Sequence, residues 1–242
     1  MSQVRSLAEA FTTELAFPKG AVPIRLRVSE RAQRVALRID GRGQAVELVL
    51  PHRTPLVSGL KFLDQNRDWV EARLKDLPRR ILFQDGAEVP VLGVKHRIRH
   101  VKRRVPGRGP AWIEDEEIRV TGEAPHVPRR VRDFLVDKAR KELSRRAHVF
   151  ADKVDREVTR ISIRDMTSRW GSCSSNGSLS FSWRLIFAPE GVLTYLVAHE
   201  VSHLVVMNHG PRFWRLVESL VPDARYRQDW LRRHRTELMR FG

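Results

Sequence analysis

HEVSHLVVMNH, from His199 to His209, is the stretch that decides the expected fold, because it spaces three histidines and a glutamate as a metal site requires. Successive residues of an α-helix turn by about 100°, so His199 and His203 would lie on one face. Two imidazole nitrogens on one face can both reach an ion at about 2 Å. The stretch therefore predicts a helix that carries two zinc ligands.

Glu200 follows the first of these histidines directly. This position puts its carboxylate beside the ion but outside the set of ligands. There it can take a proton from a zinc-bound water and later pass it to a leaving group. Glu200 is therefore the candidate catalytic residue.

His209 is the candidate third ligand, although on a continued helix it would point away from the ion. The helix is therefore expected to end first, in a turn around Asn208. Asn208 tolerates left-handed backbone angles, and Pro211 cannot continue the hydrogen-bond ladder. Three histidine ligands would leave a fourth position for water.

The residues that flank the motif predict a buried helix. Pro189 and Glu190 suit its first turn. Apolar residues then surround it, at Val192, Leu193, Leu196, Val197, Val201, Leu204 and Val205. Burying two histidines and a glutamate would be costly unless a metal satisfied them. The alternatives are ordinary solvated histidines, or Glu218 or His234 as the third ligand, since zinc also accepts carboxylate.

Four segments resemble the YgjP-like metallopeptidase family, formerly a domain of unknown function and related to the SprT-type zinc proteases. They read RVSERAQRVALRIDGRGQAVELVLP from Arg27, RDMTSRWGSCSSNGSLSFSWRLIFAP from Arg164, TYLVAHEVSHLVVMNHGPRFW from Thr194 and VPDARYRQDWL from Val221. The resemblance implies a zinc-dependent, peptidase-like hydrolase of peptide or protein substrates. It also implies Zn²⁺ as the cofactor.

The same resemblance implies His199, His203 and His209 as ligands and Glu200 as the general base. The histidine spacing also equals that of the metzincins. However, Val206 stands where their motif has glycine, and no Met-turn is evident downstream. This departure argues against membership of the metzincins.

Composition limits the class of protein. The 242 residues, 41% of them hydrophobic, suffice for one large or two small domains. The single cysteine, Cys173, excludes an internal disulfide, and Met1 to Gly20 lacks the apolar region of a signal peptide. No segment approaches the roughly 18 apolar residues of a membrane span. We expect a cytoplasmic protein without a membrane partner.

The predicted fold class is α+β. It comprises a zincin-like metallopeptidase domain, with the active-site helix beside a small sheet, after a small β-rich domain with one helix. The boundary is expected near Pro125 to Pro128, which gives domains 1–126 and 127–242. Periodicity in the first domain predicts a helix from Ser58 to Leu77, stopped by Pro78. It also predicts strands at 24–28, 35–39, 46–50, 89–101 and 118–121, of which 35–39 and 46–50 form a hairpin around Asp40-Gly41.

In the second domain, a long helix from Pro128 to Val158 is expected beside the active-site helix. A strand from Gly177 to Ala188 is expected at the sheet edge near the metal, where an extended peptide could add a strand. The alternative is a core strand without a substrate role. The segment from Arg169 to Cys173 has no assigned role, and Cys173 is expected to be buried.

The formal net charge of +16 is the second informative feature. Lys95 to Arg108 contains seven lysines or arginines and no acidic residue. Such a surface attracts polyanions, so Lys102, Arg103 and Arg104 are candidate nucleic-acid contacts. With the SprT resemblance, this suggests a protease of nucleic-acid-associated proteins. The alternative is an ordinary solvated basic surface.

Two other functions compete with the peptidase. A metal-dependent hydrolase of nucleotide phosphoanhydrides would also use a Lewis-acidic ion near a basic surface. The chain lacks a phosphate-binding glycine loop, however, and imidazole ligands favour zinc over magnesium. The second alternative is a non-catalytic nucleic-acid-binding module with a structural zinc, whose coordination would be closed.

Overall fold

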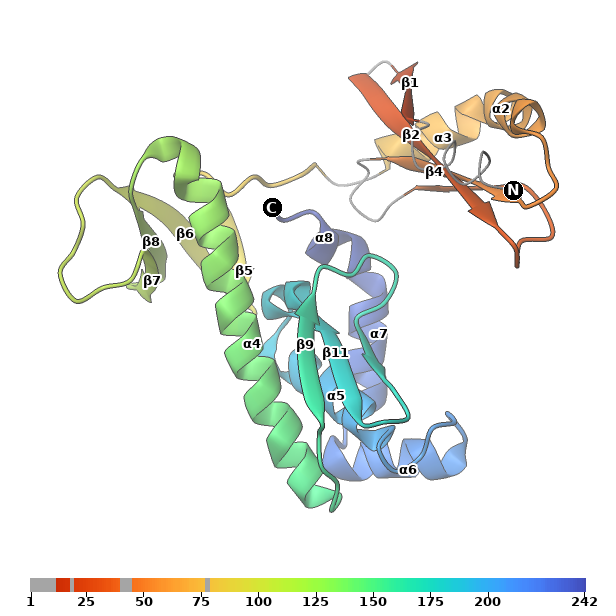
Figure 1. The fold of residues 1–242 in the computed structure, drawn as a ribbon. Coiled ribbons are helices and arrows are strands. Elements are labelled where there is room, and N and C mark those ends of the chain that lie inside the picture. Colours follow the sequence, from red (N-terminus) through yellow and green to blue (C-terminus); the bar gives the residue numbers. More distant parts are fainter. Residues whose placement is uncertain (1–11, 18–19, 40–44, 77–78) are drawn as a thin grey trace. The chain divides into compact units, whose positions relative to one another are not determined.

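The computed structural model describes residues 12–17, 20–39, 45–76 and 79–242. It divides into two compact units, residues 1–79 and 80–242 (Figure 1). The fold is α+β, as the sequence predicts. Each unit is described by itself below.

Among its described residues, the first unit has a sheet of order β1-β2-β4-β3 and two helices. Its strands are β1 (Thr12–Phe17), β2 (Gly20–Ser29), β3 (Ala36–Ile39) and β4 (Val46–Pro51). β3 and β4 pair antiparallel, which confirms the predicted hairpin, and Asp40-Gly41 lies outside the described residues. A separate core is formed by Ile24, Val46, Leu48, Leu50, Leu63 and Val70.

The single helix predicted from Ser58 to Leu77 is two helices, α2 (Leu56–Gln65) and α3 (Arg67–Lys75). The break is at Asn66, whose ψ of 20° departs from helical geometry. Its side-chain amide donates a hydrogen bond of 2.7 Å to the carbonyl oxygen of Phe62. Pro78, the predicted stop, lies outside the described residues.

The second unit begins with a sheet of order β5-β6-β8-β7. Its strands are β5 (Glu88–Val91), β6 (Val94–Val101), β7 (Ala111–Glu114) and β8 (Glu117–Thr121). The region predicted as one strand from 89 to 101 is a hairpin, because Leu92 and Gly93 adopt positive φ angles of 52° and 86°. β7 was not predicted.

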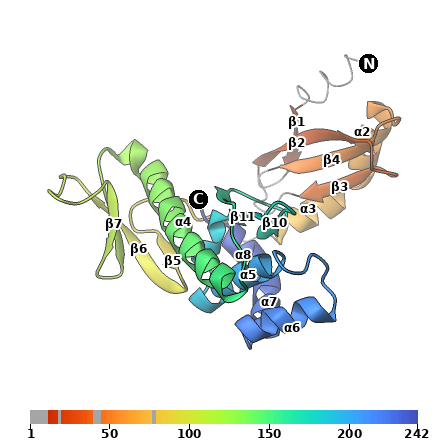
Figure 2. The same ribbon diagram turned by 60° about the horizontal axis from the view of Figure 1, so that its bottom comes forward.

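After the short 3₁₀ helix η1 (Ala124–His126), α4 runs from Val127 to Lys153, which confirms the predicted long helix. α4 lies between this sheet and α5 (Glu190–Ser202) (Figures 1 and 2). Ile118 and Val120 of β8 belong to the same core cluster as Val131 and Leu135 of α4. The boundary between units therefore falls after Arg79, and the predicted division at 126/127 differs from it because sheet and helix share one core.

A third sheet has the order β10-β11-β9. Its strands are β9 (Arg160–Arg164), β10 (Gly171–Cys173) and β11 (Ser178–Ser182). Only the first half of the strand predicted from Gly177 to Ala188 forms a strand, because Trp183–Phe187 forms the buried 3₁₀ helix η2. β11 pairs with both β10 and β9, so it is the central strand rather than the predicted edge.

Helices complete this unit: α6 (Pro211–Leu220), α7 (Ala224–Arg233) and α8 (Arg235–Met239) follow α5. α5 contacts α4, α6, α7 and β10. It is therefore the central helix of the unit. Within the described part of the chain, no helix has both the length and the apolar character that crossing a membrane requires.

Candidate metal centre

α5 carries His199 and Glu200 of the motif, and His203 caps its C-terminal end. It begins after Pro189, as predicted, and most of its residues are buried. A buried arginine of α4, Arg146, fixes its position. The Arg146 guanidinium donates to Thr194 Oγ1 at 3.1 Å and forms ion pairs with the carboxylates of Glu142 and Glu190. The helix that holds the motif is thus tied to the longest helix of the unit.

The helix ends at the second histidine, earlier than the predicted turn around Asn208. Ser202 is its last residue and His203 is the cap, with φ −67° and ψ −19°. The backbone N–H groups of Val205 and Val206 then donate to the carbonyl oxygen of Ser202 at 3.1 and 2.9 Å. This tight turn reverses the chain before α6 begins at Pro211, and it brings His209 back to the helix.

The three histidines lie together. One ligand atom from each of His199, His203 and His209 lies within 4.8 Å of the others. Nε2 of His199 and Nε2 of His209 are 3.1 Å apart. The alternative ligands lie elsewhere: Glu218 pairs with Arg225 at 3.0 Å, and Nδ1 of His234 lies 2.9 Å from the carbonyl oxygen of Trp230.

The chemistry of this donor set fits a divalent transition metal. Burial, with smaller contributions from His203 and His209, lowers the pKa of His199 to about 3. Burial also lowers the pKa of His203. Neutral imidazoles are the form that binds metal. Nδ1 of His203 lies 3.2 Å from the carbonyl oxygen of Val206, so the tautomer that donates this bond leaves Nε2 for an ion.

One nitrogen of the cluster has no hydrogen-bond partner, and a second one pairs with another imidazole. Nδ1 of His199 is buried and has no hydrogen-bond partner among the described residues. Nε2 of His199 lies 3.1 Å from Nε2 of His209, and a hydrogen bond there requires the proton on one of the two nitrogens. An ion bound by both nitrogens would satisfy this contact.

Glu200 is 5% exposed and lines the same pocket as the histidines. Burial raises the pKa of its carboxyl to about 7, against the smaller lowering effect of Arg169. Gly171 of β10 lies directly against it: a Cβ at Gly171 would be 2.5 Å from Oε1 of Glu200. The site therefore requires a glycine here, in the segment 169–173 to which the sequence pattern assigns no role.

The pocket has a volume of about 320 Å³ and joins elements far apart in the sequence. It is lined by Gly171, Ser172, Cys173, His199, Glu200, His203, Met207 and His209. Cys173 is only partly buried, which corrects the expected full burial, and desolvation raises the pKa of its thiol to about 11. Cys173 is therefore protonated at neutral pH, unlike a metal-ligating thiolate.

The family model of the YgjP-like metallopeptidase domain matches residues 33–234 of the chain. The chain belongs to this family. None of the curated proteins compared with the chain matches it. The match covers the histidine cluster, Glu200 and β10, and it extends into both units. Membership supports a metal-dependent, peptidase-like function for this YgjP-like protein.

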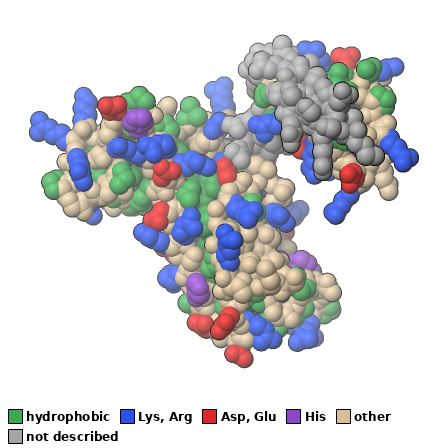
Figure 3. Space-filling view, viewed as in Figure 1, with side chains coloured by type: hydrophobic (Ala, Val, Ile, Leu, Met, Phe, Trp, Pro, Cys, Tyr) green, Lys and Arg blue, Asp and Glu red, His purple; other side chains and the backbone are tan. Residues whose placement is uncertain are grey.

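The basic residues singled out in the sequence lie away from the metal centre of this YgjP-like protein. Lys102, Arg103 and Arg104 are exposed in the loop that follows β6. Lys102 and Arg104 line a second pocket, whereas Arg103 does not. Lysine and arginine side chains gather on the surface over β6 to β8 (Figure 3).

Proposed function

We propose that this protein is a zinc metallopeptidase in which His199, His203 and His209 hold the ion and Glu200 is the general base. One observation carries the proposal. Three histidine donor atoms lie within 4.8 Å of one another, and a buried carboxylate lines the same pocket. A structural zinc site is closed by four protein ligands, whereas a catalytic site combines three ligands with an open position.

The chain's own residues would move the proton. When bound, zinc would supply a Lewis acid that polarises the scissile carbonyl and makes water more acidic. Glu200 would accept the proton of the attacking water and return it to the leaving amine. Burial raises the pKa of this carboxyl to about 7 in the metal-free protein. A nearby dication would lower this pKa and so favour the carboxylate that the base requires.

The substrate is proposed to be an extended peptide. β10 pairs with β11 on one side only and lies at the edge of its sheet. A peptide that added a strand to β10 would run past Gly171, against which Glu200 lies. Met207, 50% exposed, lines the same pocket and offers an apolar contact to a substrate side chain.

Replacing Glu200 by Gln tests the catalytic role. We expect Glu200→Gln to retain zinc and to lose cleavage of a peptide library, measured by mass spectrometry, because the amide cannot accept the proton. Glu218→Gln is the matched control, since Glu218 pairs with Arg225 outside the pocket and should leave cleavage unchanged. Cleavage by Glu200→Gln at the wild-type rate would contradict the assignment.

The proposal extends to where the enzyme acts. The net charge of +16 and the exposed Lys102, Arg103 and Arg104 support recruitment to nucleic acid, and hence substrates among nucleic-acid-associated proteins. DNA should then stimulate proteolysis, and neutralising these three residues should remove the stimulation. Unchanged stimulation in that variant would contradict recruitment through this segment.

A further inference from the structure

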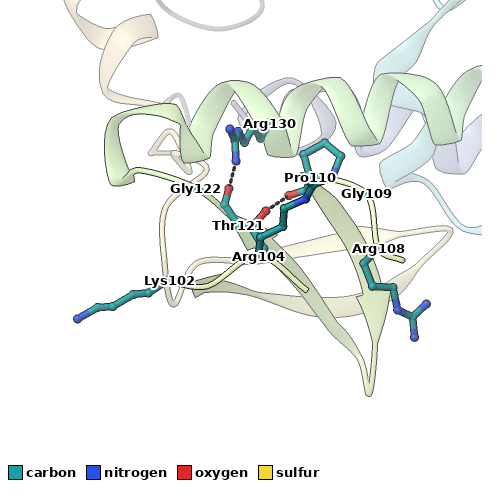
Figure 4. A pocket seen from close by; sticks show the side chains of 8 residues that line it. All are labelled: Lys102, Arg104, Arg108, Gly109, Pro110, Thr121, Gly122 and Arg130. Atoms are coloured by element: carbon teal, nitrogen blue, oxygen red, sulfur yellow. Dashed lines mark hydrogen bonds between the residues drawn. The ribbon is translucent and has the colours of Figure 1, made fainter. Parts of the chain in front are cut away.

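A second pocket of residues 80–242 lies where the loop after β6, the end of β8 and the start of α4 meet. Its volume is about 480 Å³. It is lined by Lys102, Arg104, Arg108, Gly109, Pro110, Thr121, Gly122 and Arg130 (Figure 4). Neither the family match nor the proposed peptidase chemistry assigns a role to this pocket.

The pocket is strongly cationic. Four of its eight lining residues are lysine or arginine, and none of the eight is acidic. Arg108 pairs with Glu114 at 3.0 Å, and Arg130 donates to the backbone carbonyl of Thr121. Lys102 and Arg104 are exposed. The first two cations therefore have structural partners that hold them in place, while the other two face solvent.

The start of α4 adds to the positive charge. The N-terminal end of a helix carries partial positive charge and normally attracts acidic residues. The first turn of α4 has no acidic residue, and Arg129 and Arg130 follow Pro128 instead. Since Arg130 lines the pocket, the positive end of α4 adds to the charge of the exposed Lys102 and Arg104, whereas the charge of Arg108 is paired with Glu114. An anion is the complement of this arrangement.

We propose that this pocket binds phosphate groups of a nucleic-acid backbone. Arginine and lysine are the residues that contact phosphate oxygens. Of the eight lining residues none is aromatic, so the pocket offers no surface on which a base could stack. Lys102 and Arg108 extend to opposite sides with Arg104 between them (Figure 4), an arrangement that suits successive phosphates of a polymer. Binding is therefore independent of base sequence.

This inference deepens the proposed recruitment to nucleic acid and corrects its residues. Lys102 and Arg104 of the proposed segment line the pocket together with Arg108 and Arg130, whereas Arg103 is exposed beside it. α4 lies between the β5 to β8 sheet and α5, so the pocket is separate from the metal centre (Figure 1). A bound nucleic acid would leave the catalytic pocket accessible to a protein substrate.

The test is binding of a short fluorescein-labelled DNA duplex, followed by anisotropy over a range of salt concentrations. The pocket variant is Lys102→Gln with Arg104→Gln, which keeps the partnered Arg108 and Arg130. The control is Arg140→Gln with Arg160→Gln, which removes the same charge from exposed positions of α4 and β9. Thermal melting verifies that both variants are folded. Binding is measured without peptidase activity, so failure here is distinguishable from failure of the peptidase assignment.

We expect the pocket variant to bind the duplex roughly tenfold more weakly, with a salt slope smaller by about 1.8, because two phosphate contacts are lost. The control should change affinity by less than about twofold, because it loses only long-range attraction. Equal weakening by both variants would overturn the proposal. Two competition results would also overturn it. Polyglutamate that displaces the duplex as well as unlabelled DNA does would show that carboxylates suffice. Pyrophosphate that does so at matched phosphate concentration would show a site for small phosphates.

Discussion

Glu200 is both buried and the proposed general base. Glu200 is 5% exposed and adjacent in sequence to a candidate ligand, and its carboxylate leaves no room for a Cβ at Gly171 of β10. A buried carboxylate is costly, and this cost appears as the raised pKa because the charge of Arg169 offsets only part of it. A positive ion at the histidines would remove part of it. Metal binding and the ionisation of Glu200 are therefore coupled.

Gly171→Ala tests the contact between β10 and the base. The added Cβ would lie 2.5 Å from Oε1 of Glu200, so the carboxylate must shift. We expect kcat to fall by about tenfold or more, because a displacement of about 1 Å at a reacting group is costly. Zinc content should stay unchanged. The control is Gly210→Ala, where a Cβ meets nothing within 4 Å and φ is −78°. Wild-type kcat in Gly171→Ala would show that the contact is unimportant.

The ionisation of Glu200 predicts a pH dependence of stability in the metal-free protein. The folded-state pKa is raised from 4.5 to about 7, so the folded protein binds this proton more tightly than the unfolded chain. The resulting stabilisation is complete below pH 4.5 and is lost as the pH rises through about 7. Glu200→Gln should therefore stabilise the chelated protein, relative to wild type, more at pH 8, above both pKa values, than at pH 4, below both of them.

Melting temperatures of chelated wild type and Glu200→Gln across this range give the comparison directly. Other titrating groups are shared by the two proteins and cancel in the difference. A difference that does not change with pH would show that Glu200 has an ordinary pKa in the fold.

Individual site residues can be predicted from the sequence where helical spacing determines their positions. The positions of His199, Glu200 and His203 can be predicted from helical periodicity. His209 can be predicted as a ligand only together with a chain reversal before it. Gly171, Cys173 and Met207 also line the pocket, but they come from a strand and a loop without a repeating pattern. Only the pairing of β10 with β11 and its contact with α5 places Gly171 there. Such contacts are long-range and leave no local signal.

At the scale of elements, the packing of α5 on α4 depends on Arg146. This side chain is 6% exposed and links Glu142, Glu190 and Thr194 across the two helices. Its removal would leave the Glu142 carboxylate and the Thr194 hydroxyl without this partner between packed helices. The helix that carries the metal ligands would then lose a polar connection that the apolar core cannot replace.

Arg146→Ala should lower the free energy of unfolding by about 3 kcal/mol, since one partner of a largely buried ion pair is removed. Arg145→Ala is the matched control. Arg145 is adjacent, is 62% exposed and pairs with the same carboxylate at 3.5 Å, so its loss should cost less than about 0.5 kcal/mol. Urea denaturation of both variants measures the difference. Equal values would show that the buried network contributes nothing beyond a surface pair.

Element boundaries show where sequence patterns are insufficient. The Gly177 to Ala188 region alternates like a strand throughout, but η2 replaces its second half because all five residues from Trp183 to Phe187 are buried. Arg184 in that turn pairs with Asp165 at 2.9 Å and donates to the backbone carbonyl of Phe241. These are tertiary contacts with distant segments. Periodicity reports which face is buried, whereas such contacts decide where a strand ends.

At the scale of the whole molecule, the two units have separate hydrophobic cores. The core of residues 80–242 joins the β5 to β8 sheet, α4, α5 and η2, whereas a separate cluster of six buried residues forms the core of the described part of the first unit. The predicted division at 126/127 places the sheet with the first unit, because it groups the β-rich segments of residues 1–126 into one domain. The apolar contacts that join β8 to α4 are long-range and leave no signal in the local sequence.

A fragment of residues 80–242 should therefore fold by itself and bind zinc as the full chain does. Its core and all four residues of the proposed centre lie within it. Urea denaturation should show one cooperative transition, and zinc content should match that of the full chain. A fragment that unfolds without cooperativity, or that loses zinc, would show that the first unit is required for the second.

The measurement that tests the central claim most directly is the metal content of the whole protein by elemental mass spectrometry. Wild type and His203→Ala would be treated with a mild chelator, equilibrated with zinc and desalted. We predict stoichiometric zinc in wild type and a large loss in His203→Ala, because one of three ligands is removed. Wild-type protein without bound zinc, or a variant that retains as much as wild type, would contradict the account.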